Sequence, residues 1–128
     1  MEKRKILVLD DEKKLCHMVK QRLERGGEYD VTVAYSGAEG IEKAKVTTFD
    51  LVITDFNMPG MDGNAVVEAL KAMIPQLPVV LFSVYHDDAA TITPDILSKA
   101  DGVISKPINH KQLFKTLEDV LARSRGGR

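Results

Sequence analysis

Carboxylates, a hydroxyl and an ammonium follow four short apolar runs of this sequence. Asp10 and Asp11 end one run, Asp55 ends another, and Ser83 and Lys106 follow two more. The carboxyl ends of parallel strands meet at one edge of a sheet, so we expect these side chains to converge. Two like charges about 4 Å apart repel by about 4 kcal/mol at an effective dielectric near 20. One ammonium offsets one carboxylate, and a hard divalent cation such as Mg²⁺ suits the remaining oxygen ligands.

Five apolar runs alternate with segments of helical periodicity. This alternation predicts right-handed βαβ crossovers and one parallel sheet with helices on both faces. The second run is more polar than the others, which places it near an edge of the sheet. The predicted strands are Ile6–Leu9, Val31–Ala34, Leu51–Asp55, Val79–Phe82 and Gly102–Ile104.

Helix signals lie between and after these runs. Gly26 and Gly27 are expected to end the first helix, and proline is favoured at the first position of a helix, as in Thr93-Pro94. A Ser or Asn followed three residues later by Glu or Gln indicates a helix start. The predicted starts are Ser36 with Glu39, Asp62 or Gly63, Thr93 with Pro94, and Asn109 with Gln112.

Composition predicts one globular domain. The 128 residues, of which 44% are hydrophobic and 29% charged, suit a single core. We expect a domain over 1–128 with its core at about 4–123, and with 124–128 as a loose tail or the start of a linker. The net charge of −1 gives no sign of direct nucleic-acid binding. No apolar run is long enough to cross a membrane, Cys16 has no disulfide partner, and a cytoplasmic location is expected.

These motifs in this order resemble the response-regulator receiver domain of two-component and phosphorelay signalling, the CheY-like family. The resemblance covers about residues 4–123. It implies a flavodoxin-like (βα)5 fold, a doubly wound parallel five-stranded sheet in three α/β/α layers with order 2-1-3-4-5. The residues that carry it are Asp10-Asp11, Asp55, Met58-Pro59 with Asp62-Gly63, Ser83, and Lys106-Pro107.

The resemblance also implies a role for each site residue. Asp55 would accept a phosphoryl group from a phosphohistidine. Asp10, Asp11, Asp55 and the backbone carbonyl of Asn57 would bind Mg²⁺, with Mn²⁺ as a substitute. Lys106 would pair with the phosphoryl oxygens, the Ser83 hydroxyl would move to bond them, and the Lys106-Pro107 bond would be cis. Positioning and charge neutralisation are what phosphoryl transfer needs most from a protein.

The partners implied by the resemblance are a sensor histidine kinase or phosphotransfer protein and an output domain or downstream protein. The output would dock on the face formed by the fourth helix, fifth strand and fifth helix, and a phosphorylation-dependent dimer is compatible with the family. Such a protein is not a metabolic enzyme, because it catalyses only its own phosphorylation and dephosphorylation.

Two positions depart from the family pattern. Val103 stands where the family carries Tyr or Phe, the ring that rotates inward when the Ser or Thr moves. Val84 is larger than the usual residue after the hydroxyl. We therefore expect the conformational change to involve residues 84–100 more than Val103.

Two other classes compete with this interpretation. A haloacid-dehalogenase-like phosphatase or phosphotransferase also forms an aspartyl phosphate, but it carries Asp-x-Asp after the first strand, and Asp10-Asp11-Glu12 lacks that spacing. A flavodoxin-like cofactor carrier would need a phosphate-binding loop there, and an acidic pair is the opposite of what a phosphate requires.

Overall fold

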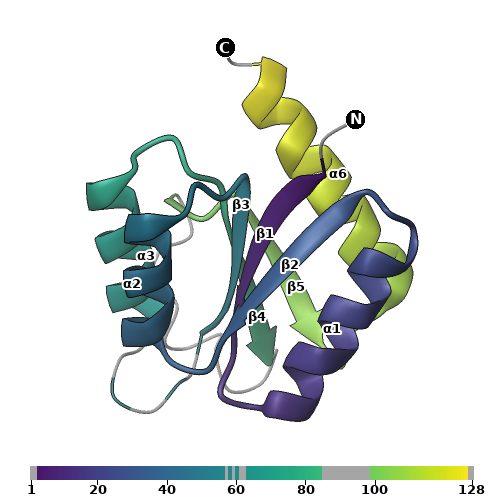
Figure 1. Cartoon of the computed structure of the whole chain (residues 1–128), viewed down its shortest axis with the longest axis horizontal. Coiled ribbons are helices and arrows are strands. Elements are labelled where there is room, and N and C mark those ends of the chain that lie inside the picture. Colours follow the sequence, from purple (N-terminus) through teal and green to yellow (C-terminus); the bar gives the residue numbers. More distant parts are fainter. Residues whose placement is uncertain (1–2, 57, 59, 61–62, 85–98, 127–128) are drawn as a thin grey trace.

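A parallel five-stranded sheet forms the centre of the protein (Figure 1). The computed structural model describes residues 3–56, 58, 60, 63–84 and 99–126. The strand order is β2-β1-β3-β4-β5, which confirms the order implied by the resemblance. The strands are β1 (Arg4–Leu9), β2 (Tyr29–Ala34), β3 (Leu51–Asp55), β4 (Val79–Val84) and β5 (Gly102–Lys106).

The predicted strands are present, but four of them are longer than expected. Backbone pairing continues through polar residues, because the ladder uses only N–H and C=O groups. Ser83 pairs with Ser105, and Val84 pairs with Lys106. The predicted ends of these two strands, Phe82 and Ile104, are therefore two residues short. Ser83 and Lys106 lie within the last two residues of β4 and β5, at the predicted carboxyl edge of the sheet.

Helices cover both faces of the sheet and make three layers (Figure 1). One face carries α1 (Lys13–Arg25) and α6 (His110–Gly126), and the other carries α2 (Gly37–Val46) and α3 (Gly63–Met73). Successive strand residues point to opposite faces. Ile6 and Val8 accordingly join the core beneath α1 and α6, while Leu7 and Leu9 join the core beneath α2 and α3. The predicted helix that starts at Thr93 lies mostly outside the described residues.

The predicted helix starts are largely confirmed. The Ser36 Oγ accepts a hydrogen bond from the Glu39 N–H at 3.1 Å, and Asn109 Oδ1 accepts one from the Gln112 N–H at 3.1 Å. The Glu39 carboxylate does not return to Ser36, as a capping box would require, but accepts from the Tyr35 N–H at 2.7 Å. Tyr35 directly follows β2, so this bond ties α2 to the end of the edge strand.

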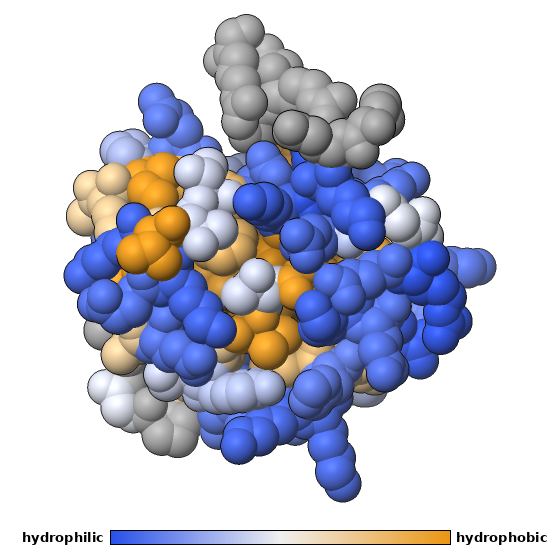
Figure 2. Space-filling model, viewed as in Figure 1, coloured by the Kyte–Doolittle hydropathy of each residue, from blue (hydrophilic) through white to orange (hydrophobic). Residues whose placement is uncertain are grey.

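The outer edge of β2 is covered by charged side chains from both flanking helices. In α1, Glu24 accepts from the Val31 N–H at 2.9 Å and Lys20 donates to the Val31 C=O at 2.6 Å. In α2, Lys43 donates to the C=O of Val33 at 2.8 Å. The side of the molecule with β2 in front is largely polar, with apolar areas in its centre and at its upper left (Figure 2). Among the described residues, no helix has the length and hydropathy needed to span a bilayer.

Candidate functional site

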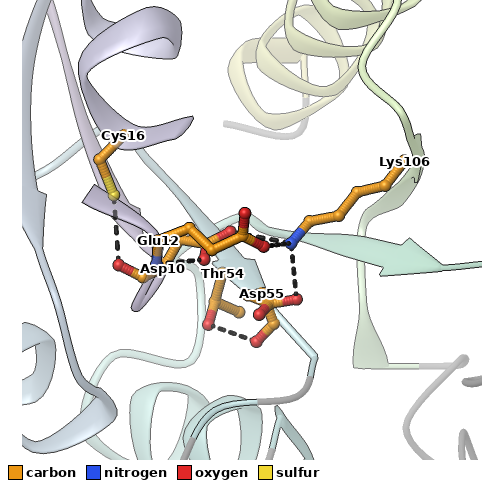
Figure 3. Close-up of polar contacts among 6 residues, drawn as sticks. All are labelled: Asp10, Glu12, Cys16, Thr54, Asp55 and Lys106. Atoms are coloured by element: carbon orange, nitrogen blue, oxygen red, sulfur yellow. Dashed lines mark hydrogen bonds and ion pairs between the residues drawn. The ribbon is translucent and has the colours of Figure 1, made fainter. Parts of the chain in front are cut away.

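Lys106 joins two aspartates that come from other strands. Its extended side chain leaves β5 and places Nζ 3.0 Å from Asp10 Oδ2, beyond the end of β1, and 3.3 Å from Asp55 Oδ1 at the end of β3 (Figure 3). The side chains are 13%, 0% and 8% exposed, respectively. The structure therefore brings these three predicted site residues into one largely buried cluster at the carboxyl edge of the sheet.

Asp11 completes a group of carboxylates. One carboxylate oxygen from each of Asp10, Asp11 and Asp55 lies within 4.8 Å of the others, with Asp11 at the exposed rim and the other two buried. The donor set consists of oxygen alone, as Mg²⁺ prefers. The three carboxylates outnumber the single ammonium of Lys106, so the chemistry of the residues present fits a divalent cation. Asn57, the remaining predicted metal ligand, lies outside the described residues.

Asp10 is held by the residues that follow it. The Glu12 N–H donates to Asp10 Oδ1 at 2.9 Å, and the Cys16 thiol donates to the Asp10 backbone carbonyl at 3.2 Å (Figure 3). Burial raises the pKa of Asp10, although the Glu12 N–H and Lys106 act in the opposite direction. Burial, with the nearby Asp10 charge, raises the pKa of Cys16 to about 12, so this thiol stays protonated and serves packing.

Lys106 remains an ammonium in this cluster. Burial alone would lower its pKa, but the hydrogen bond to Asp10 and the charges of Asp10 and Asp55 raise the pKa overall. The lysine is therefore a permanent positive charge at neutral pH.

A close backbone approach shapes the chain that follows Asp55. The Gly63 N–H donates to the Phe56 carbonyl at 2.7 Å. A Cβ on Gly63 would lie 2.7 Å from Phe56 Cα, so only glycine fits at the start of α3. The Phe56 N–H in turn donates to the Phe82 carbonyl at 3.0 Å, which extends the pairing of β3 with β4 past Asp55.

Ser83 lies on the same edge, and Val103 does not face the core. Asp55 pairs with Phe82, so Ser83 is one residue further along β4, where it is buried. Val103 is 38% exposed on β5, whereas the adjacent Ile104 is fully buried. The side chain of Val84 and the segment from Tyr85 to Thr91 lie outside the described residues, so the prediction about residues 84–100 stays a prediction.

The sequence patterns did not single out Glu12, which also reaches the cluster. Its Oε1 lies 3.6 Å from Lys106 Nζ (Figure 3). The only signal available in the sequence was its place directly after Asp10-Asp11.

The sequence profile of the response regulator receiver domain matches residues 6–118. The chain belongs to this family, and its role is that of a phosphoacceptor domain in two-component signalling. The resemblance to the receiver-domain family is thereby confirmed, and the haloacid-dehalogenase-like alternative is not favoured.

Relatives and solved structures agree with this assignment. The chain is 34% identical over 120 residues to the transcriptional regulatory protein ZraR of Salmonella typhimurium, covering 94% of this chain and 27% of ZraR. It is 30% identical over 121 residues to the alkaline phosphatase synthesis transcriptional regulatory protein PhoP of Bacillus subtilis, covering 94% of this chain and 50% of PhoP. The chain thus spans from about a quarter to about half the length of these two relatives.

Two solved structures show the same fold. A response regulator receiver domain from Clostridium thermocellum superposes with a TM-score of 0.88 at 27% identity, covering 98% of this chain and 99% of that one. The chemotaxis response regulator CheY4 of Vibrio cholerae gives a TM-score of 0.82 at 30% identity, covering 93% of this chain and 99% of that one.

Proposed function

We propose that Asp55 is the phosphoacceptor of this receiver domain. The observation that carries the proposal is the bridging position of Lys106, whose ammonium lies 3.3 Å from Asp55 and 3.0 Å from Asp10. Asp55 is the carboxylate at the end of a strand that is buried throughout. An Asp55 oxygen would attack the phosphorus of a phosphohistidine on a sensor kinase or phosphotransfer protein. The P–N bond would break, and the imidazole would leave.

We propose that Asp10, Asp11 and Asp55 bind Mg²⁺, or Mn²⁺ in its place. The ion would neutralise negative charge on the carboxylates and the incoming phosphoryl oxygens. Lys106 would pair with a phosphoryl oxygen, and the Ser83 hydroxyl would donate a hydrogen bond to another. The backbone carbonyl of Asn57 would be a further ligand of the metal ion. The support is the shared placement of the described groups at one sheet edge.

Output would follow from a population shift between inactive and active arrangements. We propose that an output domain or a separate protein docks on the face of β5 and α6, together with the predicted fourth helix, which lies mostly outside the described residues. We also propose that phosphorylation can favour a dimer. The named relatives are transcriptional regulators, which supports a transcriptional output for the signalling protein and a cytoplasmic location. Catalysis by the domain would be limited to its own phosphorylation and dephosphorylation.

Intact-mass measurement after incubation with acetyl phosphate and Mg²⁺ tests the acceptor. The wild-type chain should gain one phosphoryl group, and Asp55→Asn should gain none. Asp30→Asn is the matched control, because Asp30 is an exposed aspartate on β2 away from the cluster, and it should behave as wild type. Phosphorylation of Asp55→Asn would refute the assignment.

A further inference from the structure

Glu12 occupies the N-cap position of α1 but does not cap the helix. Its backbone is extended, with φ −84° and ψ 101°, and its side chain makes no hydrogen bond to the first turn. Ser, Thr, Asp and Asn are the usual side chains at this position because they bond the free N–H groups. A capping role therefore does not account for a glutamate here.

The Glu12 side chain turns toward the site. Its carboxylate approaches Lys106 Nζ at 3.6 Å, and in Figure 3 this contact leaves the nitrogen in a different direction from the contact to Asp55. It is 66% exposed, whereas Lys106 is 13% exposed, so it lies at the mouth of the cluster. Glu12 and Lys106 also line a cavity of about 480 Å³ with Leu15, Met18, Pro107 and Ile108.

Glu12 differs from the other partners of Lys106 in one respect. Asp10 and Asp55 belong to the group of carboxylates that could hold a metal ion. In the part of the chain that the structure describes, Glu12 is not a member of this group. A bound divalent cation would offset the attraction of Asp10 and Asp55 for the ammonium. Glu12 would then be the carboxylate beside Lys106 whose negative charge the bound cation does not offset.

We propose that Glu12 is a positioning residue that retains the Lys106 ammonium at the mouth of the metal-loaded site and competes for it with the phosphoryl group. The inference rests on the proposed function, since it assumes that Mg²⁺ and a phosphoryl group bind at this cluster. Glu12 then limits phosphorylation in two ways. It holds the lysine away from the phosphoryl oxygens, and its negative charge repels an anionic donor.

The first experiment needs no phosphorylation. In protein labelled with ¹⁵N-lysine, the Lys106 ammonium signal is identified by its loss in Lys106→Met, and its exchange with solvent is followed as Mg²⁺ is added. In wild type the exchange should stay slow at saturating Mg²⁺, and in Glu12→Gln it should become at least threefold faster. Glu42→Gln is the matched control, because Glu42 also pairs with a lysine, at 3.1 Å on α2. Equal exchange in Glu12→Gln and wild type would overturn the proposal.

The second experiment measures phosphorylation by acetyl phosphate. Glu12→Gln should be phosphorylated about threefold faster at low ionic strength, the size expected for one partly screened charge, and the gain should shrink in high salt. Glu12→Asp keeps the charge on a shorter side chain and should fall between the two. Slower phosphorylation of Glu12→Gln, or a tenfold loss of Mg²⁺ affinity, would overturn the proposal. A wild type that takes up no phosphoryl group would count against the proposed function, while the exchange experiment would still show whether Glu12 retains the Lys106 ammonium.

Discussion

Two lysine–aspartate pairs lie at opposite ends of the sheet, and they differ in how their charges are balanced. At the amino ends of β4 and β5, Lys71 Nζ lies 2.8 Å from Asp101 Oδ2. The same oxygen accepts from the Val79 N–H at 2.8 Å, and Lys71 also donates to the Leu77 carbonyl at 2.8 Å. One positive charge thus meets one negative charge, and their remaining bonds tie backbone segments together.

The pair at the carboxyl ends has a surplus of negative charge. Lys106 faces Asp10, Asp55 and Glu12, and Asp11 lies close by. Asp10 is held from two sides, because Lys106 Nζ donates to its Oδ2 at 3.0 Å and the Glu12 N–H donates to its Oδ1 at 2.9 Å. The balanced Lys71–Asp101 pair therefore stabilises the fold. In the unbalanced cluster the carboxylates repel one another, and a bound cation would relieve that repulsion at the site of phosphoryl chemistry.

Removing Lys106 should have the largest effect on stability of the changes considered for these two ends of the sheet. Lys106→Met leaves buried carboxylates without a counter-charge, so the free energy of unfolding without metal at pH 7 should fall by about 3 kcal/mol. Mg²⁺ should recover part of the loss, because it replaces the missing positive charge. Urea denaturation with and without Mg²⁺ measures both effects. Lys115→Met removes an exposed lysine of α6 and should cost less than about 0.5 kcal/mol. Equal losses in the two variants would contradict the account of the cluster.

The balanced pair should respond to mutation but not to metal. Asp101→Ala removes the acceptor for the Val79 N–H and the partner of Lys71, which should lower the free energy of unfolding by about 2 kcal/mol. Mg²⁺ should give no recovery, and Mg²⁺ affinity should stay at the wild-type value. Denaturation and a metal titration on the same samples test this. Recovery of Asp101→Ala by Mg²⁺ would remove the distinction between the two ends of the sheet.

The smallest expected effect concerns pH. Burial raises the pKa of Asp10 in the fold above its ordinary value of 3.8, so the folded state binds this proton more tightly than the unfolded state. The resulting stabilisation is complete below the unfolded pKa and is lost as pH rises through the folded pKa. As metal-free protein is brought from pH 7 toward pH 4, wild type should therefore gain stability relative to Asp10→Asn. If the free energy of unfolding changes with pH by the same amount in both proteins, Asp10 is not the source of the pH dependence.

The sequence predicted the fold well because strand interiors are continuous apolar runs. It also predicted that Asp10, Asp11, Asp55 and Lys106 meet, because topology brings the carboxyl ends of parallel strands to one edge. The ends of the strands were less predictable. Backbone pairing continues through Ser83 and Lys106 whatever their polarity, so hydropathy alone ended β4 and β5 two residues early.

Sequence patterns could not predict contacts between side chains that are far apart in the chain. Lys71 and Asp101 are 30 residues apart and follow no periodicity. Glu39 was expected to complete a capping box, but the backbone that leaves β2 offers it the Tyr35 N–H instead. The approach of Glu12 to Lys106 likewise depends on side-chain reach across two segments far apart in the chain.

The covered edge of β2 has a consequence for self-association. An edge strand with free N–H and C=O groups is a template on which another chain can pair and aggregate. Here a second strand would first have to displace the carboxylate of Glu24 and the ammonium groups of Lys20 and Lys43. The Val31 N–H lowers the pKa of Glu24, so this carboxylate stays ionised in mildly acidic solution. The backbone groups of Val31 and the carbonyl of Val33 are thus blocked against strand pairing between two copies of this domain.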